Sequence, residues 1–208
     1  MKIGILALQG DVREHADMLK KLNAEPVLVK RPVDLEHIDA LIIPGGESTA
    51  ISLLMRKHGL DKKIKEKCAQ GMPIYGTCAG AILLATKILG NNMKPLGLID
   101  IDIERNSYGR QIDSFEAELS IREIGAFKGV FIRAPLIKRL HNGAEIMAEH
   151  NKFPVMLRQN NVLITTFHPE LTNDARVHQY FLSMAKEYKE IKEMQRDLEK
   201  NNVQSSFS

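Results

Sequence analysis

Residues 73–85 decide the fold, and they read Pro73-Ile74-Tyr75-Gly76-Thr77-Cys78-Ala79-Gly80-Ala81-Ile82-Leu83-Leu84-Ala85. The apolar run 73–75 predicts a buried strand, and the apolar run 81–85 predicts a helix packed on a sheet. A cysteine flanked by small residues at such a strand-to-helix corner has the form of a nucleophile elbow. Gly76 and Gly80 fit this interpretation, because a larger Cβ would clash where the chain turns so sharply. The alternative is a buried structural cysteine between loop glycines.

Strands and helices alternate through the first 90 residues. Strands are predicted at 2–8, 26–29, 40–43 and 73–75, and helices at 11–22 (capped by Asp11), after 40–43 (capped by Ser48 or Thr49), and at 61–69. This alternation is typical of a parallel sheet covered by helices on both faces. Such sheets place their sites at the carboxyl ends of the strands. We therefore expect Gln9-Gly10, Gly45-Gly46 and Cys78 to lie close together at one edge.

The second half of the chain is richer in strands. Extended segments are predicted at 98–104, 114–119, 129–133, 145–149, 155–159 and 162–167, with turn residues such as Asn142-Gly143 between them. The expected fold class is therefore α/β, with a mostly parallel central sheet flanked by helices and additional antiparallel strands in the second half.

A helix is predicted from Asp174 to about Lys200. Its first part carries a packing face, and from Lys186 onward it is mostly charged, which predicts that it projects into solvent. We expect one domain over residues 1–188, followed by a charged helical extension and a disordered tail over 189–208. The expected packing residues are Val177, Tyr180, Phe181, Met184 and Ala185.

Composition excludes several classes of protein. The 208 residues are 44% hydrophobic and 26% charged, with a net charge of +3 that does not suggest a nucleic-acid partner. Two cysteines argue against a disulfide framework and favour a reducing compartment. No apolar run approaches a membrane span. The N-terminal run 1–8 has the length of a short signal core, but the polar Gln9-Gly10-Asp11 follows at once, so a first strand and a cytoplasmic location are expected.

A thiol nucleophile needs a base, and the base needs an orienting group. Among seven histidines, His168 follows the apolar run 162–167 and so lies at a strand end. Residues two apart in an extended segment point to one side, so Glu170 is placed to reach one ring nitrogen of His168 while the other faces Cys78. A surface His-Pro-Glu turn is the alternative. His15 is expected to be a packing residue, and the others, expected at surface or loop positions, are His37, His58, His141, His150 and His178.

Gly45-Gly46 is expected to supply a backbone N–H from Gly46 that forms an oxyanion hole with the N–H of Ala79. A glycine-rich turn before a helix also suits a phosphate group. That competing interpretation lacks the lysine and the spacing of a P-loop.

These features resemble the class I (triad) glutamine amidotransferases, and within them the glutaminase subunits of pyridoxal 5′-phosphate synthase. The resemblance covers roughly residues 1–188. The matching motifs are Ala7-Leu8-Gln9-Gly10, Pro44-Gly45-Gly46-Glu47-Ser48-Thr49, Gly76-Thr77-Cys78-Ala79-Gly80, Glu104-Arg105-Asn106, Tyr108-Gly109-Arg110-Gln111, Asp113-Ser114-Phe115-Glu116, Phe131-Ile132-Arg133-Ala134-Pro135 and His168-Pro169-Glu170.

The resemblance implies an activity and roles. Cys78 would attack the side-chain amide of L-glutamine, with His168 as base and Glu170 as its orienting group. The thioester formed would be hydrolysed to glutamate. The resemblance also implies that ammonia passes to a separate synthase subunit that makes pyridoxal 5′-phosphate. The residues it implies for glutamine binding are Gly46, Glu47, Ser48, Arg105, Ile132 and Arg133.

Gln9 and Gly10 offer no catalytic group at the expected site edge. We expect this loop to be a contact through which the partner sets the oxyanion geometry. No cofactor or metal ligand set is expected. Three alternatives stay open: the glutaminase of another pathway such as histidine biosynthesis, a cysteine hydrolase or peptidase on a related sheet, and a non-catalytic regulatory subunit. The block from Arg105 to Glu116 argues against the first, and an intact Cys78, His168 and Glu170 argues against the last.

Overall fold

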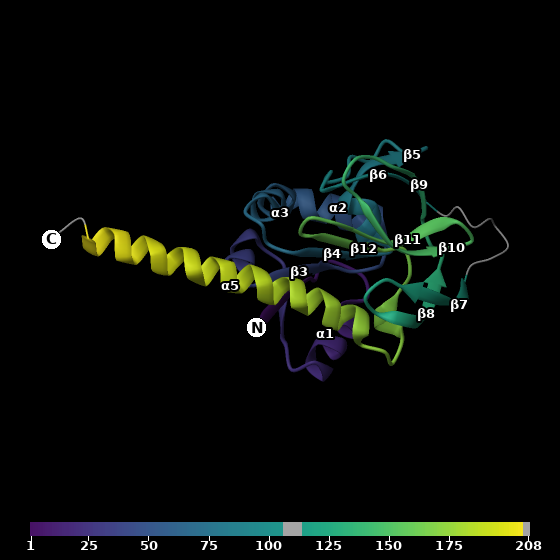
Figure 1. The fold of residues 1–208 in the computed structure, drawn as a ribbon. Helices are drawn as coiled ribbons and strands as arrows, with labels where there is room; N and C mark the ends of the chain where they lie inside the picture. Colours follow the sequence, from purple (N-terminus) through teal and green to yellow (C-terminus); the bar gives the residue numbers. More distant parts are fainter. Residues whose placement is uncertain (106–113, 206–208) are drawn as a thin grey trace.

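A seven-stranded sheet forms the centre of the molecule, with helices on both of its faces (Figure 1). The computed structural model describes residues 1–105 and 114–205, with side chains as far as Leu198. The sheet has the strand order β10-β11-β12-β4-β3-β1-β2. Its strands are β1 (Lys2–Leu6), β2 (Glu25–Val29), β3 (Ala40–Ile43), β4 (Ile74–Thr77), β10 (Glu145–His150), β11 (Phe153–Gln159) and β12 (Val162–Thr165).

The five strands β12, β4, β3, β1 and β2 run parallel, and β11 and β10 add to the β12 edge in antiparallel pairs. The predicted fold class is therefore confirmed. Four neighbouring parallel strands end at one edge of the sheet: β1 leads into Gln9-Gly10, β3 into Gly45-Gly46, β4 into Cys78 and β12 toward His168. This order brings segments far apart in the sequence to one place, as parallel sheets do.

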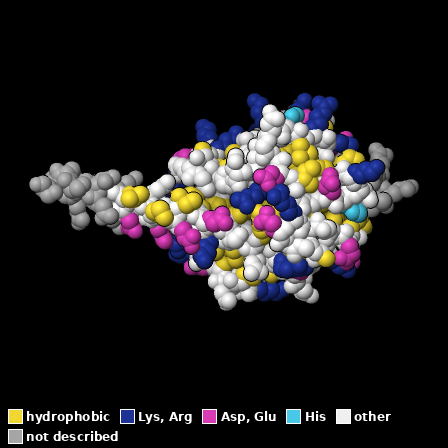
Figure 2. Space-filling model, viewed as in Figure 1, with side chains coloured by type: hydrophobic (Ala, Val, Ile, Leu, Met, Phe, Trp, Pro, Cys, Tyr) yellow, Lys and Arg dark blue, Asp and Glu magenta, His cyan; other side chains and the backbone are white. Residues whose placement is uncertain are grey.

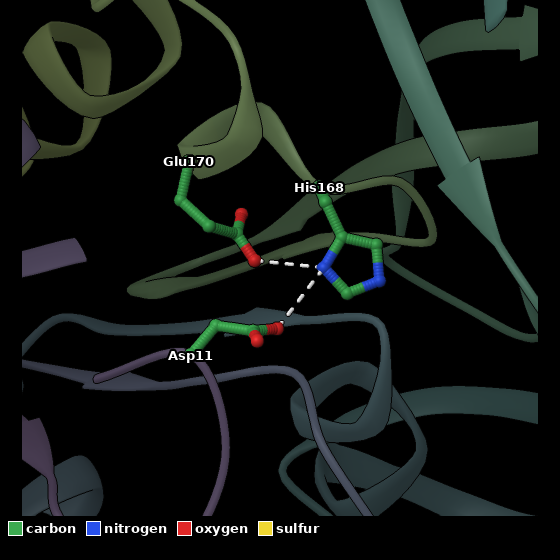
Figure 3. A group of neighbouring side chains, drawn as sticks. All are labelled: Asp11, His168 and Glu170. Carbon is green, nitrogen blue, oxygen red and sulfur yellow. Dashed lines mark hydrogen bonds and ion pairs between the residues drawn. The ribbon is translucent and has the colours of Figure 1, made fainter. Parts of the chain in front are cut away.

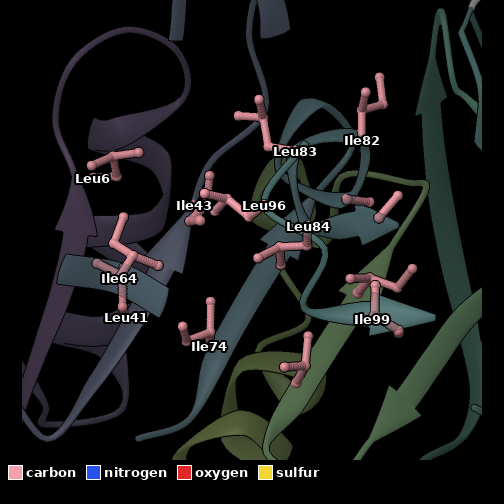
Figure 4. Close-up of a cluster of buried hydrophobic side chains, with 14 of the residues drawn as sticks. Leu6, Leu41, Ile43, Ile64, Ile74, Ile82, Leu83, Leu84, Leu96 and Ile99 are labelled. Atoms are coloured by element: carbon pink, nitrogen blue, oxygen red, sulfur yellow. The ribbon is translucent and has the colours of Figure 1, made fainter. Parts of the chain in front are cut away.

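Strand residues alternate between two hydrophobic cores, because successive side chains point to opposite faces of a sheet. One core packs α2 (Ser48–Lys57), α3 (Leu60–Ala69) and α4 (Ala79–Leu84) on the sheet and contains Leu41, Ile43 and Ile74 (Figure 4). The other core packs α1 (Val12–Lys21) and α5 (Arg176–Ser205) on the opposite face and contains Ala40, Ile42 and Tyr75.

Two smaller sheets complete the second half. β5 (Ala85–Leu89), β6 (Ile99–Glu104) and β9 (Leu136–Leu140) form one, and the hairpin of β7 (Ser114–Ile121) and β8 (Gly125–Ile132) forms the other. The sequence did not predict β5, because this strand begins at Ala85 directly after α4, with no turn residues between them. It did not predict β9 either, because charged residues interrupt the apolar pattern of that strand. Two 3-10 helices, η1 (Pro32–His37) and η2 (Pro169–Leu171), make short connections.

Helix α5 extends well beyond the body of the protein (Figure 1), as the charged sequence after Lys186 predicts. It continues to Ser205, past the predicted end at Lys200, and residues 206–208 of the predicted tail lie outside the described residues. The projecting part is not purely polar: Figure 2 shows hydrophobic side chains along it, and Ile191, Met194 and Leu198 are more than half exposed.

The predicted packing face of α5 is confirmed at Val177, Phe181, Met184 and Ala185, which are all buried. The expectation for His178 was wrong, because this residue is fully buried against the sheet face rather than at the surface. Over the described part of the chain, none of the helices has both the length and the apolar character needed to cross a membrane.

Candidate active site

Cys78 occupies the sharp corner between β4 and α4, as the elbow pattern predicts. Its backbone has φ 46° and ψ −99°, a conformation that costs a non-glycine residue about 1–3 kcal/mol and that surrounding structure must enforce. A Cβ built on Gly76 would lie 2.6 Å from the backbone carbon of Gly80, and one built on Gly80 would lie 2.0 Å from the oxygen of Ile43. The predicted crowding on both sides of the elbow is therefore confirmed.

His168 and Glu170 form a buried pair whose side chains point toward each other (Figure 3). Nδ1 of His168 lies 2.8 Å from Oε1 of Glu170, and the Cys78 side chain is close enough to His168 to help raise the pKa of its imidazole. The Sγ atom of Cys78 lies 3.8 Å from the carbonyl oxygen of Ile132, toward which the thiol is able to donate. The three side chains predicted for catalysis are thus in one connected group.

Asp11 joins this group, which the sequence interpretation missed. Its Oδ2 lies 3.3 Å from Nδ1 of His168, on the same ring nitrogen as Glu170 (Figure 3). Asp11 does precede α1 as expected, but its side chain makes no capping hydrogen bond. The expected cap was therefore wrong, and the carboxylate serves His168 instead. Its place directly after Gln9-Gly10, at the edge expected to hold the site, was the signal available in the sequence.

These contacts control the charge of the imidazole. Burial lowers the pKa of His168, but hydrogen bonds with Asp11, Cys78 and Glu170 outweigh it and raise that pKa to about 12. Burial likewise raises the pKa of the Glu170 carboxyl, while its hydrogen bond to His168 opposes the rise. The direction of this shift favours the protonated form of His168, the form that is able to donate a proton.

Asp11, His168 and Glu170 are also the residues most suited to a metal ion in the described part of the chain, with ligand atoms within 4.8 Å of one another. The hydrogen bonding explains their proximity without one. A charged imidazolium donates through Nδ1 to the carboxylates, and its single positive charge offsets part of their negative charge.

The glycine loop after β3 is held on both sides. The N–H of Gly45 donates to Oγ1 of Thr77 at 2.9 Å, and the carbonyl of Gly45 accepts from the N–H of Asp11 at 3.1 Å. Because a trans peptide points its N–H and C=O in opposite directions, the N–H of Gly46 is directed away from Asp11. Gln9 reaches the same loop, since its Oε1 accepts from the N–H of Glu47 at 2.7 Å.

A cleft of about 320 Å³ opens above these groups. All but one of the residues predicted for catalysis, the oxyanion hole and glutamine binding line this cleft; the exception is Glu170, which lies buried behind His168. The residues lining it are Gln9, Asp11, Gly46, Glu47, Ser48, Cys78, Ala79, Ile82, Arg105, Ile132, Arg133, His168 and Leu171.

Glu47 and Arg105 pair with each other at the mouth of the cleft. Nη2 of Arg105 lies 3.2 Å from Oε1 of Glu47, and Nη1 lies 3.1 Å from Oγ1 of Thr49. Glu47 also caps α2, because its carboxylate accepts from the N–H groups of Thr49 and Ala50. Burial alone would raise the pKa of Glu47, but these hydrogen bonds and Arg105 together lower it. The expectation that Ser48 or Thr49 caps this helix was therefore wrong.

Arg133 also lines the cleft. It is exposed and has φ 42°, a left-handed conformation unusual for an arginine. It follows Ile132 at the end of β8, whose carbonyl faces the thiol. The motif residues Asn106, Tyr108–Gln111 and Asp113 lie outside the described residues.

A second cavity, of about 400 Å³, lies between α5 and the opposite end of the sheet. Its walls include Gly71, Asn161 and Tyr188, and it contains none of the predicted site residues.

The sequence model of the SNO glutamine amidotransferase family matches residues 5–187. The chain is 49% identical over 190 residues to the protein named pyridoxal 5′-phosphate synthase subunit PdxT from Fervidobacterium nodosum, covering 91% of this chain and 100% of that protein. It is 52% identical over 190 residues to the protein of the same name from Geobacillus kaustophilus, covering 91% and 97% of the two chains.

Solved structures agree with the sequence relatives. A crystal structure described as a glutamine amidotransferase is 47% identical and superposes with a TM-score of 0.86, covering 88% of this chain and 98% of that one. A chain in the structure of PurLQS from Thermotoga maritima shares the fold at 18% identity, with a TM-score of 0.66 and coverage of 88% and 97%. With the cysteine elbow, its buried histidine and glutamate, and close relatives over nine-tenths of its length, this chain belongs to the SNO glutamine amidotransferase family.

Proposed function

We propose that this protein is the glutaminase subunit of a pyridoxal 5′-phosphate synthase, which hydrolyses L-glutamine to L-glutamate and ammonia. One observation carries the proposal. Cys78 at the β4–α4 corner meets His168, from the segment after β12, at a cleft whose size suits an amino acid, and Glu170 contacts His168 from behind. The relatives, about half identical over most of the chain, bear the name of that subunit.

The chemistry proceeds through a covalent intermediate. Sγ of Cys78 attacks the side-chain carbonyl carbon of glutamine, and the thiol proton resides on His168. The tetrahedral oxyanion is stabilised by the N–H of Ala79, which has no partner within α4, and by the N–H of Gly46. The C–N bond then breaks, and His168 donates its proton to the departing ammonia. Water adds to the thioester, returning a proton to the thiolate and releasing glutamate.

Glutamine binding falls to the rim of the cleft. The zwitterionic end of the substrate needs a cation for its carboxylate and an acceptor for its ammonium group. Glu47 and Arg105 offer both in one ion pair, and Arg133, which also lines the cleft, offers a second cation. Gly46, Ser48 and Ile132 line the same cleft. We assign the substrate contacts to these six residues.

Ammonia is delivered to a synthase subunit in this proposal. At neutral pH free ammonia is mostly ammonium, which is not nucleophilic, so a closed path to the acceptor preserves the reactive form. We assign Gln9 and Gly10 to the contact with that subunit. We also propose that the glutaminase domain ends at residue 188, which the family match over residues 5–187 supports. A cytoplasmic location remains a prediction from the cysteine usage.

The test is glutamine turnover by the full chain with and without a synthase subunit of this enzyme class. Cys78→Ala is expected to abolish hydrolysis while the protein still folds and binds its partner, because alanine fits the corner but offers no nucleophile. Cys68, the other buried cysteine, lies outside the cleft, so Cys68→Ala is the matched control and is expected to keep wild-type turnover. Glutamine hydrolysis by pure Cys78→Ala protein would overturn the assignment.

A further inference from the structure

A chain of hydrogen bonds runs beneath the active site, away from the cleft. It starts at the N–H of Gly45, which donates to Oγ1 of Thr77 at 2.9 Å. Oγ1 of Thr77 lies 3.1 Å from Nε2 of His15, and Nδ1 of His15 lies 2.9 Å from Nε2 of His178. Thr77, His15 and His178 are all 0% exposed. Three polar side chains buried together at this depth need a reason, because each must find partners there.

The same chain touches the catalytic carboxylate. Nε2 of His15 lies 3.6 Å from Oε1 of Glu170, the oxygen that Nδ1 of His168 contacts at 2.8 Å. His15 therefore stands between the two halves of the site: the glycine loop on one side, through Thr77, and the acid that orients His168 on the other. It comes from α1 and His178 from α5, so both helices on this face of the sheet contribute.

The contacts favour one arrangement of protons. Thr77 accepts from the N–H of Gly45, so its hydroxyl proton is free to be donated, and Nε2 of His15 is the acceptor within reach. His15 then carries its proton on Nδ1 and donates it to Nε2 of His178. Among the ring nitrogens of His15 and His178, this arrangement leaves only Nδ1 of His178 without a hydrogen-bond partner. The opposite tautomer leaves the Thr77 hydroxyl proton without an acceptor as well.

We propose that Thr77 and His15 are positioning residues that hold the glycine loop in register with the triad. Thr77 accepts a hydrogen bond from the N–H of Gly45 and so holds the loop in place. His15, which is itself hydrogen-bonded to His178, fixes the direction in which the Thr77 hydroxyl points. The neighbouring peptide of Gly45 and Gly46 carries the N–H assigned to the oxyanion hole. This inference rests on the proposed glutaminase function and adds to it the part that sets the loop.

The first test separates positioning from mere stability. Thr77→Val keeps the shape of the side chain and removes the hydrogen bond to Gly45, while Thr77→Ser keeps the hydroxyl. Thr165→Val is the matched control: Thr165 pairs with Thr77 in register on the neighbouring strand and is equally buried, but its hydroxyl bonds Tyr75 and the Phe167 carbonyl instead of the loop. Glutamine turnover is measured with the synthase subunit present, and melting temperature is measured alongside.

Thr77→Val is expected to lower kcat by about 10–100-fold, below the 10²–10³ of deleting an oxyanion donor outright, with KM nearly unchanged. Thr77→Ser is expected to recover most of the rate, and Thr165→Val to keep it despite a similar loss of melting temperature. A folded Thr77→Val protein with wild-type kcat overturns the proposal, and so does an equal loss of kcat in Thr165→Val, because the effect would then belong to any buried hydroxyl.

His15 is tested through a double-mutant cycle. His15→Leu is expected to lose as much kcat as Thr77→Val, and the double variant no more than either alone, because both cut the same chain. His15→Gln places an amide oxygen where Nε2 accepts and is expected to restore part of the rate. Additive losses in the double variant would show that His15 does not act through Thr77.

A readout independent of turnover keeps this inference distinct from the proposed function. Amide hydrogen exchange at Gly45 is expected to accelerate at least about tenfold in Thr77→Val and His15→Leu but not in Thr165→Val, because the amide loses its acceptor. If wild-type protein with the synthase subunit failed to hydrolyse glutamine, the proposed function would be wrong. Exchange at Gly45 would still decide whether Thr77 and His15 hold the Gly45 amide in place. Unchanged exchange in both variants overturns the inference.

Discussion

Asp11 and His168 are joined across the site edge, with Oδ2 of Asp11 3.3 Å from Nδ1 of His168. Glu170 contacts the same nitrogen at 2.8 Å, so one ring nitrogen faces two carboxylates. The two acids differ in their surroundings: the side chain of Glu170 is 0% exposed and that of Asp11 is 32% exposed. Glu170 is therefore the main orienting group, and Asp11 adds charge from a position that solvent partly screens.

Asp11→Asn is expected to lower kcat by about tenfold or less, because the buried Glu170 partner remains. The clearer effect is on pH dependence. Asp11 helps to raise the pKa of His168, so removing its charge lowers that pKa, and the alkaline limb of the kcat/KM profile shifts to lower pH. Asp17→Asn, on α1 and exposed, is the control. An alkaline limb that does not move would show that Asp11 is not coupled to His168.

Glu170→Gln is expected to reduce turnover less than His168→Asn. Glutamine keeps an oxygen near Nδ1 but loses the charge that stabilises the imidazolium, whereas asparagine removes the proton carrier itself. By comparison with other triads, losing the orienting group costs about 10²–10⁴ in kcat. Both variants are measured with the synthase subunit present. Wild-type turnover in Glu170→Gln would reduce Glu170 to a structural residue.

The parallel sheet, the elbow and the common position of the three strand-end loops were predictable, because each depends on local pattern and on one general rule about strand ends. Cys78 with small neighbours and His168 after an apolar run carry that information in a few residues. The residues predicted to bind glutamine came from the family resemblance, since exposed residues such as Arg133 have no local pattern that marks them.

The sequence failed where tertiary contacts override a local rule. Asp11 has the position of a helix cap, but the strand order brings His168 within reach of its carboxylate and the cap is not made. His178 lies on the same face of α5 as Phe181 and Ala185, but its polar side chain suggested a surface position, and in the folded chain it meets the buried His15. Pairings of this kind join residues more than 150 positions apart, and single-sequence periodicity carries no information about them.

Acid is expected to destabilise the protein through its buried histidines. Burial lowers the pKa of His178 from 6.5 to about 4, and lowers the pKa of His15 as well. Between those pH values the unfolded chain binds protons that the folded chain does not, so the free energy of unfolding rises with pH and falls on acidification. For His178 alone the loss is about 1.4 kcal/mol per pH unit, or about 3 kcal/mol over the whole range.

Two other site groups have the opposite sign. The pKa values of His168 and Glu170 are raised in the folded state, so each contributes stability that is lost as pH rises toward its folded pKa. The measurement that isolates His178 is therefore a difference. Urea unfolding at pH 7 and pH 5 is compared for wild type and His178→Phe, with the exposed His58→Gln as control. An equal pH dependence in wild type and His178→Phe would contradict the assignment.

The loop after β1 contacts the segment that we propose as the oxyanion hole. Oε1 of Gln9 accepts from the N–H of Glu47, which adjoins Gly46. Gly10 packs so closely on the glycine loop that a Cβ there would lie 1.8 Å from the oxygen of Gly45, and its φ of 105° suits glycine alone. Gln9 and Gly10 are themselves exposed. A protein that binds this loop would therefore contact residues next to the peptide whose N–H we propose to stabilise the oxyanion.

The isolated protein is accordingly expected to be a poor glutaminase whose turnover rises when the synthase subunit binds, by up to the 10²–10³ in rate that an oxyanion donor is worth. Glutamine turnover is titrated with that subunit for wild type, Gln9→Ala and Gly10→Ala. Both loop variants are expected to bind the partner and respond weakly, Gly10→Ala least, because its methyl group must displace the Gly45 carbonyl. Gly90→Ala controls for placing alanine at a positive φ, since a Cβ there meets open space. High turnover by the isolated wild type, unchanged by the partner, would reject activation by the synthase subunit. Normal activation of both loop variants would support such activation but exclude Gln9 and Gly10 from it.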